Sequence, residues 1–111
     1  MDKESLTEKL LDLVEGRETP ESWRNWWDEH ETELEALLSR GEFLKLKPCR
    51  HGFQWVPVFG SQKRAIAILE KSGTAFEASN LYQERYLAEL DAFCKEQERV
   101  QREKQKEFKA N

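Results

Sequence analysis

The side chains best suited to chemistry in this chain are its two cysteines and two histidines. Cys49 and His51 are close together in the sequence, whereas His30 and Cys94 are far from them. A structural zinc ion takes four such ligands in local pairs, and the spacing of Cys49 and His51 matches none of the usual pairs. The same two residues could serve as nucleophile and base, but no third group is placed to orient the histidine. We therefore expect no metal, no cofactor and no catalytic residue.

Motifs of the common enzyme classes are missing as well. The sequence has no glycine-rich phosphate loop, no G-x-S-x-G and no H-E-x-x-H. We therefore expect that the protein is not an enzyme and that its function depends on binding.

A concentration of carboxylates suggests what could be bound. Residues 1–42 hold 13 acids and 5 bases, and several acids share one side of a helix that we expect over residues 20–40. An acidic helix face speeds the encounter with a basic protein, and tryptophan often anchors such an interface. The predicted partner-binding residues are Trp26, Asp28, Glu29, Glu31 and Glu35. The alternative is that these carboxylates form an ordinary solvated helix face.

Residues 43–64 have the opposite charge, with five bases and no acid. Basic side chains bind phosphate groups, and aromatic rings stack on nucleobases. This mixture is therefore typical of proteins that bind single-stranded nucleic acid. The predicted nucleic-acid-binding residues are Lys45, Lys47, Arg50, Trp55 and Arg64. The alternative is that the aromatic residues fill the core, and the net charge of −4 makes nucleic acid the less favoured partner. The acidic and basic regions could also attract each other within the fold.

Capping patterns and apolar periodicity predict the helices that carry these residues. Ser5 followed by Glu8 predicts the start of a helix over residues 6–15. Thr19 followed by Pro20 predicts the start of a second helix over residues 20–40. In the second helix, Trp23 and Trp27 share the apolar stripe and should lie in the core, while Trp26 lies nearer its edge.

Three short segments favour strands instead. Residues 43–47 alternate between apolar and basic side chains, residues 53–59 are aromatic and β-branched, and residues 74–77 could pair with them or form only an extended linker. A short helix is expected over residues 61–71.

A long last helix is expected from residue 80. Residues 95–111 hold ten charged residues, so its end should be frayed. Two copies could pair along this helix as a coiled coil, although the seam decays into charged positions. That seam would consist of Tyr86, Leu90, Phe93, Gln97, Val100, Lys104 and Glu107.

Composition agrees with one small, highly charged domain. The 111 residues are 38% apolar and 36% charged, against averages of roughly 45–50% and about 25%. No apolar run approaches the roughly 18 residues of a membrane span, no signal peptide is recognisable, and two cysteines do not make a disulfide framework. These features predict a cytoplasmic protein that does not enter a membrane.

The combined prediction is an α+β fold, rich in helix, with about four helices packed on a small two- or three-stranded sheet and a long C-terminal helix. Residues 1–95 should form one domain and residues 96–111 a charged helical extension. The predicted core residues are Leu10, Val14, Trp23, Trp27, Leu34, Leu38, Leu44, Leu46, Ile66, Leu69, Phe76, Tyr86, Leu90 and Phe93.

The predicted function is that of a small acidic protein-interaction module, for example an immunity protein or an antitoxin-type inhibitor that masks a basic enzyme. The expected partner is another protein with a basic surface, and the chain itself should be a monomer or a weak dimer. The alternative function is binding of RNA or single-stranded nucleic acid through residues 43–64.

Overall fold

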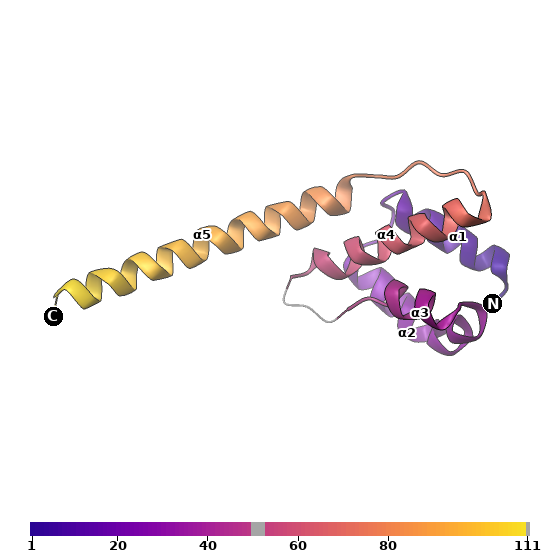
Figure 1. Ribbon diagram of the computed structural model, residues 1–111, viewed down its shortest axis with the longest axis horizontal. Helices are drawn as coiled ribbons and strands as arrows, with labels where there is room; N and C mark the ends of the chain where they lie inside the picture. Colours follow the sequence, from indigo (N-terminus) through magenta and orange to yellow (C-terminus); the bar gives the residue numbers. More distant parts are fainter. Residues whose placement is uncertain (50–52, 111) are drawn as a thin grey trace.

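The computed structural model describes residues 1–49 and 53–110, with side chains as far as residue 102, and these ranges contain five helices. The helices are α1 (Lys3–Val14), α2 (Pro20–Leu37), α3 (Arg40–Leu46), α4 (Trp55–Ser72) and α5 (Leu81–Ala110) (Figure 1). No β-strand occurs in the described ranges. The fold is therefore all-helical, and the predicted α+β architecture, with helices packed on a small sheet, is wrong.

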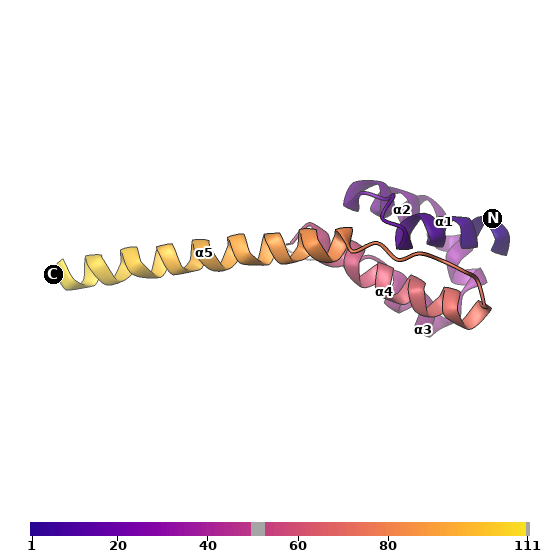
Figure 2. The ribbon, with the colours of Figure 1, turned by 90° about the horizontal axis from the view of Figure 1, so that it is seen from above.

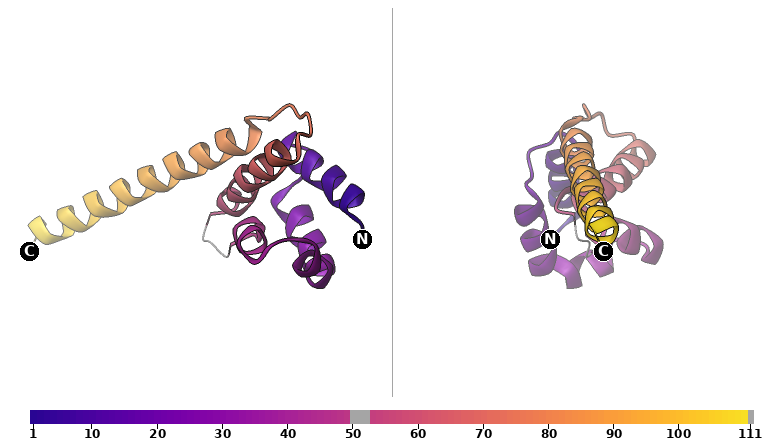
Figure 3. Two further views of the ribbon diagram at one scale, coloured as in Figure 1. Left: turned by 45° about the vertical axis from the view of Figure 1, so that its right-hand side comes forward. Right: turned by 90° about the vertical axis from the view of Figure 1, so that its left-hand side faces the viewer.

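Helix α4 is the centre of the fold, because it contacts each of the other four helices. Figure 2 shows α1 and α2 on one side of the molecule and α3 and α4 on the other, and Figure 3 shows the same bundle from two further directions. The buried apolar residues form one cluster that all five helices supply. Its members are Leu6, Leu10, Leu13, Val14, Trp23, Trp27, Leu34, Phe43, Leu46, Val58, Ala65, Leu69 and Tyr82.

Half of the predicted core residues are fully buried, and the exceptions have simple causes. Leu38, Ile66 and Phe76 are half-buried and pack against the cluster, while Tyr86 and Leu90 are half-buried on α5. Two predictions were wrong. Leu44 is 57% exposed because α3 turns it away from α4, and Phe93 is 47% exposed because α5 is leaving the body at that point.

Side-chain caps begin α1 and α2, and both predicted helices are present, but α2 ends at Leu37 and Arg40, expected in its last turn, begins α3 instead. Thr19 Oγ1 accepts from the backbone N–H of Ser22 at 3.0 Å, and Ser22 Oγ accepts from the backbone N–H of Thr19 at 2.9 Å. This reciprocal box satisfies two N–H groups that the helix itself leaves free. Helix α1 starts earlier than predicted, since Asp2 Oδ1 accepts from the backbone N–H of Ser5 at 2.8 Å.

The predicted strand over residues 43–47 is wrong, because residues 43–46 belong to the helix α3 and Lys47 follows its end. Ser39 Oγ accepts from the backbone N–H of Glu42 at 3.2 Å and donates to the Glu42 carboxylate at 3.1 Å. Phe43 and Leu46, three residues apart, are the two buried side chains of α3. That spacing belongs to a helix, whereas the alternation of leucine and lysine only resembled a strand.

The predicted strand over residues 53–59 is wrong too, because α4 begins at Trp55. Pro57 lies in the first turn of α4, where a backbone N–H has no partner within the helix and proline is tolerated. The cap comes from α5, whose Glu89 carboxylate accepts from the N–H groups of Gln54 at 2.8 Å and of Trp55 at 2.6 Å. A carboxylate is favourable at this positive helix end.

The predicted short helix over residues 61–71 is confirmed as the second half of α4, and no strand follows it. Residues 74–79 form an extended linker, which was the alternative to the third strand. Gln62 holds this linker in place, because its Nε2 donates to the carbonyl oxygens of Val14 and Ser79, each at 2.9 Å.

Tyr82 ties the start of α5 to the loop between α1 and α2. Its side chain is buried, and its hydroxyl donates to the carbonyl of Glu18 at 2.8 Å and accepts from the N–H of Glu18 at 2.9 Å. The Glu18 carboxylate is buried as well, where it pairs with Lys9 and accepts from the Ser22 hydroxyl. Burial raises the pKa of Tyr82 to about 12.

Among the described side chains, those that dock helix α5 on the body belong to its first half. Three aromatic pairs hold it, with ring centroids 5.3 to 5.9 Å apart. The pairs are Trp55–Tyr82, Phe59–Tyr86 and Phe53–Phe93. The second half projects away from the bundle, so the molecule measures 65 × 28 × 21 Å (Figure 1).

Candidate functional site

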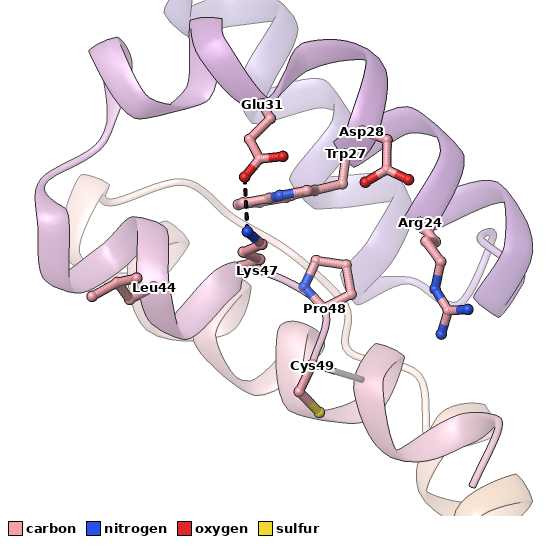
Figure 4. A pocket seen from close by; sticks show the side chains of 8 residues that line it. All are labelled: Arg24, Trp27, Asp28, Glu31, Leu44, Lys47, Pro48 and Cys49. Atoms are coloured by element: carbon pink, nitrogen blue, oxygen red, sulfur yellow. Dashed lines mark hydrogen bonds and ion pairs between the residues drawn. The ribbon is translucent and has the colours of Figure 1, made fainter. Parts of the chain in front are cut away.

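A groove of about 430 Å³ lies between α2 and the segment that begins with α3 (Figure 4). Helix α2 supplies one wall, and Leu44 of α3 with the three residues that follow this helix supplies the other. The lining residues are Arg24, Trp27, Asp28, Glu31, Leu44, Lys47, Pro48 and Cys49. The groove therefore combines charges of both signs with an apolar floor.

Trp27 forms the floor of this groove. Its side chain is 1% exposed, and its indole ring packs against Phe43 with centroids 5.3 Å apart. Figure 4 shows the ring behind the Glu31–Lys47 pair and above Pro48. The indole Nε1 is buried and has no hydrogen-bond acceptor among the described residues. A buried donor without an acceptor costs about 1–3 kcal/mol.

The carboxylates on the wall differ in whether they are already paired. Glu31 forms an ion pair with Lys47 at 2.8 Å, which joins α2 to the end of α3. Asp28 is exposed and forms no ion pair with any described residue. Among the described residues of the basic segment, Lys47 alone therefore pairs with one of the predicted carboxylates along the groove.

A second hollow of about 290 Å³ continues the groove along α2. Glu35, Arg40, Phe43 and Leu44 line it, and Leu44 borders both hollows. Glu35 is exposed and has no ion-pair partner within the described part of the chain. The groove thus has arginines at its two ends, carboxylates between them and an exposed leucine in its wall.

The structure divides the predicted partner-binding residues between two flanks of α2. Asp28, Glu31 and Glu35 are three and four residues apart, so they lie on the flank that faces α3. Glu29 lies about 100° further round the helix, towards the flank that carries Trp26. Trp26 is half-buried there, stacked on Trp23 and beneath the ammonium group of Lys9 at 5.3 Å.

The predicted nucleic-acid-binding residues come together only in part. Lys45 and Arg64 line a shallow hollow of about 270 Å³ with Lys63, between α3 and α4. Lys47 points instead to Glu31, and Trp55 is half-buried and stacked on Tyr82. Arg50 lies outside the described residues.

Sequence reasoning missed Arg24, Leu44 and Arg40 as residues of the groove. Leu44 had been assigned to the core, because the expected strand would have turned it inward. The pattern Ser39-x-x-Glu42 was the signal that could have corrected this, since it marks a helix start just before Leu44.

The described residues contain no group of three or more histidine, cysteine, aspartate or glutamate side chains that could hold a metal ion. Cys49 and Cys94 are both exposed free thiols, and His51 lies outside the described residues. Within the described part of the chain, no helix is long and apolar enough to cross a membrane.

Comparison with known proteins adds no relative to this picture. No family model matches the chain, and neither a curated protein nor a solved structure matches it. The groove and the charges around it are therefore the features that indicate a function.

Proposed function

We propose that this protein is a protein-interaction module whose α2–α3 groove binds a basic segment of another protein. The observation that carries the proposal is that Asp28 and Glu35 border the groove, are exposed, and form no ion pair with a described residue. Carboxylates in this state attract a cationic partner without first giving up a partner of their own.

The groove also supports the apolar part of such an interface. Leu44 is 57% exposed between the two hollows, where an apolar side chain of the partner can cover it. Arg24 and Arg40 at the two ends favour a segment whose bases are central and whose ends are neutral or acidic.

An inhibitor of a basic enzyme, of the immunity-protein or antitoxin type, is the more specific form of this proposal. The acidic balance of residues 1–42 supports it, because long-range attraction speeds the capture of a basic protein. Glu29 and Trp26, on the other flank of α2, would then form the rim of the same interface.

The test uses a short labelled peptide with central lysines and leucines, and a second peptide in which glutamate replaces lysine. We expect only the basic peptide to bind, and the amide NMR signals of α2 and α3 to move. The double variant Asp28→Asn, Glu35→Gln should weaken binding about tenfold, because each exposed pair contributes up to ~1 kcal/mol.

The matched control is the double variant Glu70→Gln, Glu77→Gln, which removes the same charge from exposed positions away from the groove. Its affinity for the basic peptide should equal that of the unchanged protein. Equal losses in the two double variants would mean that only net charge matters, and absence of binding to the basic peptide would overturn the proposal.

A second candidate function is supported by the hollow of Lys45, Lys63 and Arg64, which no acid lines. Three cations around one depression are suited to phosphate groups, as in RNA or single-stranded DNA. A gel shift with a mixed-sequence oligonucleotide at low salt tests it. A shift that Lys45→Gln and Lys63→Gln together abolish would favour nucleic acid over the peptide as the ligand.

A further inference from the structure

A hollow of about 400 Å³ opens at the end of the bundle opposite to the projecting part of α5, and we call it the aliphatic hollow. Figures 1 and 2 show the start of α1 and the end of α4 at this same end of the molecule. Both supply walls of the hollow, and the end of α2 and the start of α3 complete it. Six of its eleven lining residues are leucine or isoleucine, namely Leu6, Leu10, Leu37, Leu38, Ile68 and Leu69.

The lining of the aliphatic hollow continues the core of the protein to its surface. Leu6, Leu10 and Leu69 belong to the buried cluster. The other three aliphatic residues are half-buried and pack against that cluster. A concave, mostly apolar surface of this volume, with a few polar groups at its edge, is the usual form of a site for a small molecule.

Two lysines at the rim of the aliphatic hollow favour an anion. Lys3 begins α1 and Lys71 lies in the last turn of α4, and both are exposed. Neither forms an ion pair with another described residue. The acid that lines the same hollow is Glu42, whose carboxylate accepts from the Ser39 hydroxyl at 3.1 Å. The lining therefore holds two bases and one acid, and its net charge is positive.

We propose that the aliphatic hollow binds a fatty acid in its ionised form. The six leucine and isoleucine side chains cover an unbranched hydrocarbon chain, since they are flexible and present no flat ring on which an aromatic ligand could stack. The carboxylate lies at the rim against Lys3 and Lys71, where it forms charge-assisted hydrogen bonds. In this position the charged head group keeps its contact with water while the chain leaves water.

Chain length tests whether the hydrocarbon enters the hollow. Isothermal titration calorimetry on the full chain compares hexanoate, octanoate and decanoate, each below its micelle concentration. The affinity should rise by up to about fourfold for each added methylene group, which is ~0.8 kcal/mol of burial. In NMR spectra, decanoate should shift the methyl signals of Leu37, Leu38 and Ile68. The methyl signals of Leu44 and Leu87, which are exposed elsewhere, should stay unchanged.

Removal of charge tests the role of the two lysines. The double variant Lys3→Gln, Lys71→Gln should weaken octanoate binding about fivefold, which is ~1 kcal/mol for two exposed ion pairs. It should leave the binding of octanol, which has the same chain without the carboxylate, unchanged. The matched control is Lys45→Gln, Lys95→Gln, which removes the same charge from exposed positions outside the hollow and should not change either affinity.

Glu42→Gln provides a test in the opposite direction. Glutamine at this position can still cap the start of α3, because it also completes a capping box. The substitution removes a negative charge from the lining, so octanoate binding should strengthen about twofold. Octanol binding should stay the same.

Two results would contradict the fatty-acid site. The first is the absence of decanoate binding at millimolar concentration while circular dichroism shows that the protein is folded. The second is an octanoate affinity that Lys3→Gln, Lys71→Gln does not change, since the occupant of the hollow would then be purely apolar, such as a side chain of a partner protein.

The fatty-acid site and the α2–α3 groove can be tested separately, because the two hollows share no lining residue. Substitutions at Lys3, Lys71 and Glu42 leave Asp28 and Glu35 in place. Loss of fatty-acid binding in these variants, with binding of the basic peptide retained, would assign the two ligands to two sites.

Discussion

At the residue scale, the contact between Tyr82 and Glu18 joins parts of the chain that are 64 residues apart. The Tyr82 hydroxyl satisfies both the N–H and the carbonyl of Glu18 in a buried loop. Tyr82→Phe keeps the ring but leaves both backbone groups without a partner, and should lower the free energy of unfolding by about 1–3 kcal/mol. Urea denaturation measures this loss.

Tyr86→Phe is the natural control for that measurement. Tyr86 is half-buried on the same helix, and its hydroxyl makes no hydrogen bond to a described residue. Its removal should leave the urea midpoint almost unchanged. Equal effects of the two substitutions would mean that the hydroxyl of Tyr82 contributes nothing beyond its ring.

The same tyrosine makes stability depend on alkaline pH. Burial raises the pKa of Tyr82 from 10.0 to about 12, so above pH 10 the unfolded chain loses this proton while the folded chain still holds it. Its contribution is fully present below pH 10 and declines as the pH rises towards 12. Urea midpoints across this range should fall more steeply for the unchanged protein than for Tyr82→Phe, and parallel curves would contradict the assignment.

At the element scale, sequence reasoning succeeded where the periodic apolar pattern extended over many residues and failed where it covered only a few. Helix α2 has 18 residues, and its stripe of tryptophans and leucines has only one interpretation. Residues 43–47 fit both a strand and a single helical turn. The cap at Ser39 marks the helix start in the local sequence. The packing of Phe43 and Leu46 against α4, which completes the choice, is not visible in the local sequence.

The start of α4 could not be predicted for a related reason. Gln54 makes no side-chain cap, and the groups that satisfy this helix end belong to Glu89, more than thirty residues later. Aromatic and β-branched residues then favoured a strand by propensity alone, and tertiary contacts overrode that propensity. Helix boundaries set by distant side chains lie beyond local patterns.

Gly41 gives a direct test of α3 as a helix. It has no positive φ, and a Cβ at this position would meet nothing within 4 Å. Gly41→Ala should therefore raise the free energy of unfolding by about 0.5–1 kcal/mol, since alanine loses less backbone entropy in a helix. Thermal or urea denaturation can measure the gain.

Gly16→Ala is the contrasting substitution, because Gly16 has a φ of 82° and a Cβ there would lie 2.7 Å from Ser79 Oγ. It should destabilise the protein while Gly41→Ala stabilises it. A destabilising effect of Gly41→Ala would argue against the helical conformation of residues 40–46.

At the scale of the whole molecule, the separation of acidic and basic regions along the sequence indicated that these regions could interact, but not which of their side chains would pair. The acidic and basic regions do meet, through Glu31 and Lys47, yet Asp28 and Glu35 form no ion pair with a described residue. Composition cannot distinguish these outcomes, because the choice depends on how α2 is rotated against α3. The groove itself follows from the same packing angle, which no local pattern encodes.

The first half of α5 packs on the body, and the second half projects from it. This difference predicts that a proline has different effects in the two halves. Gln101→Pro breaks α5 beyond its docked half, so it should reduce the helical circular dichroism while leaving the urea midpoint unchanged at low protein concentration. Ala88→Pro breaks the docked half near Glu89 and should lower the midpoint as well, because the cap of α4 is lost. If Gln101→Pro lowered the midpoint as much as Ala88→Pro, the outer half of α5 would have to contribute to the stability of the body, contrary to the contacts that this fold provides.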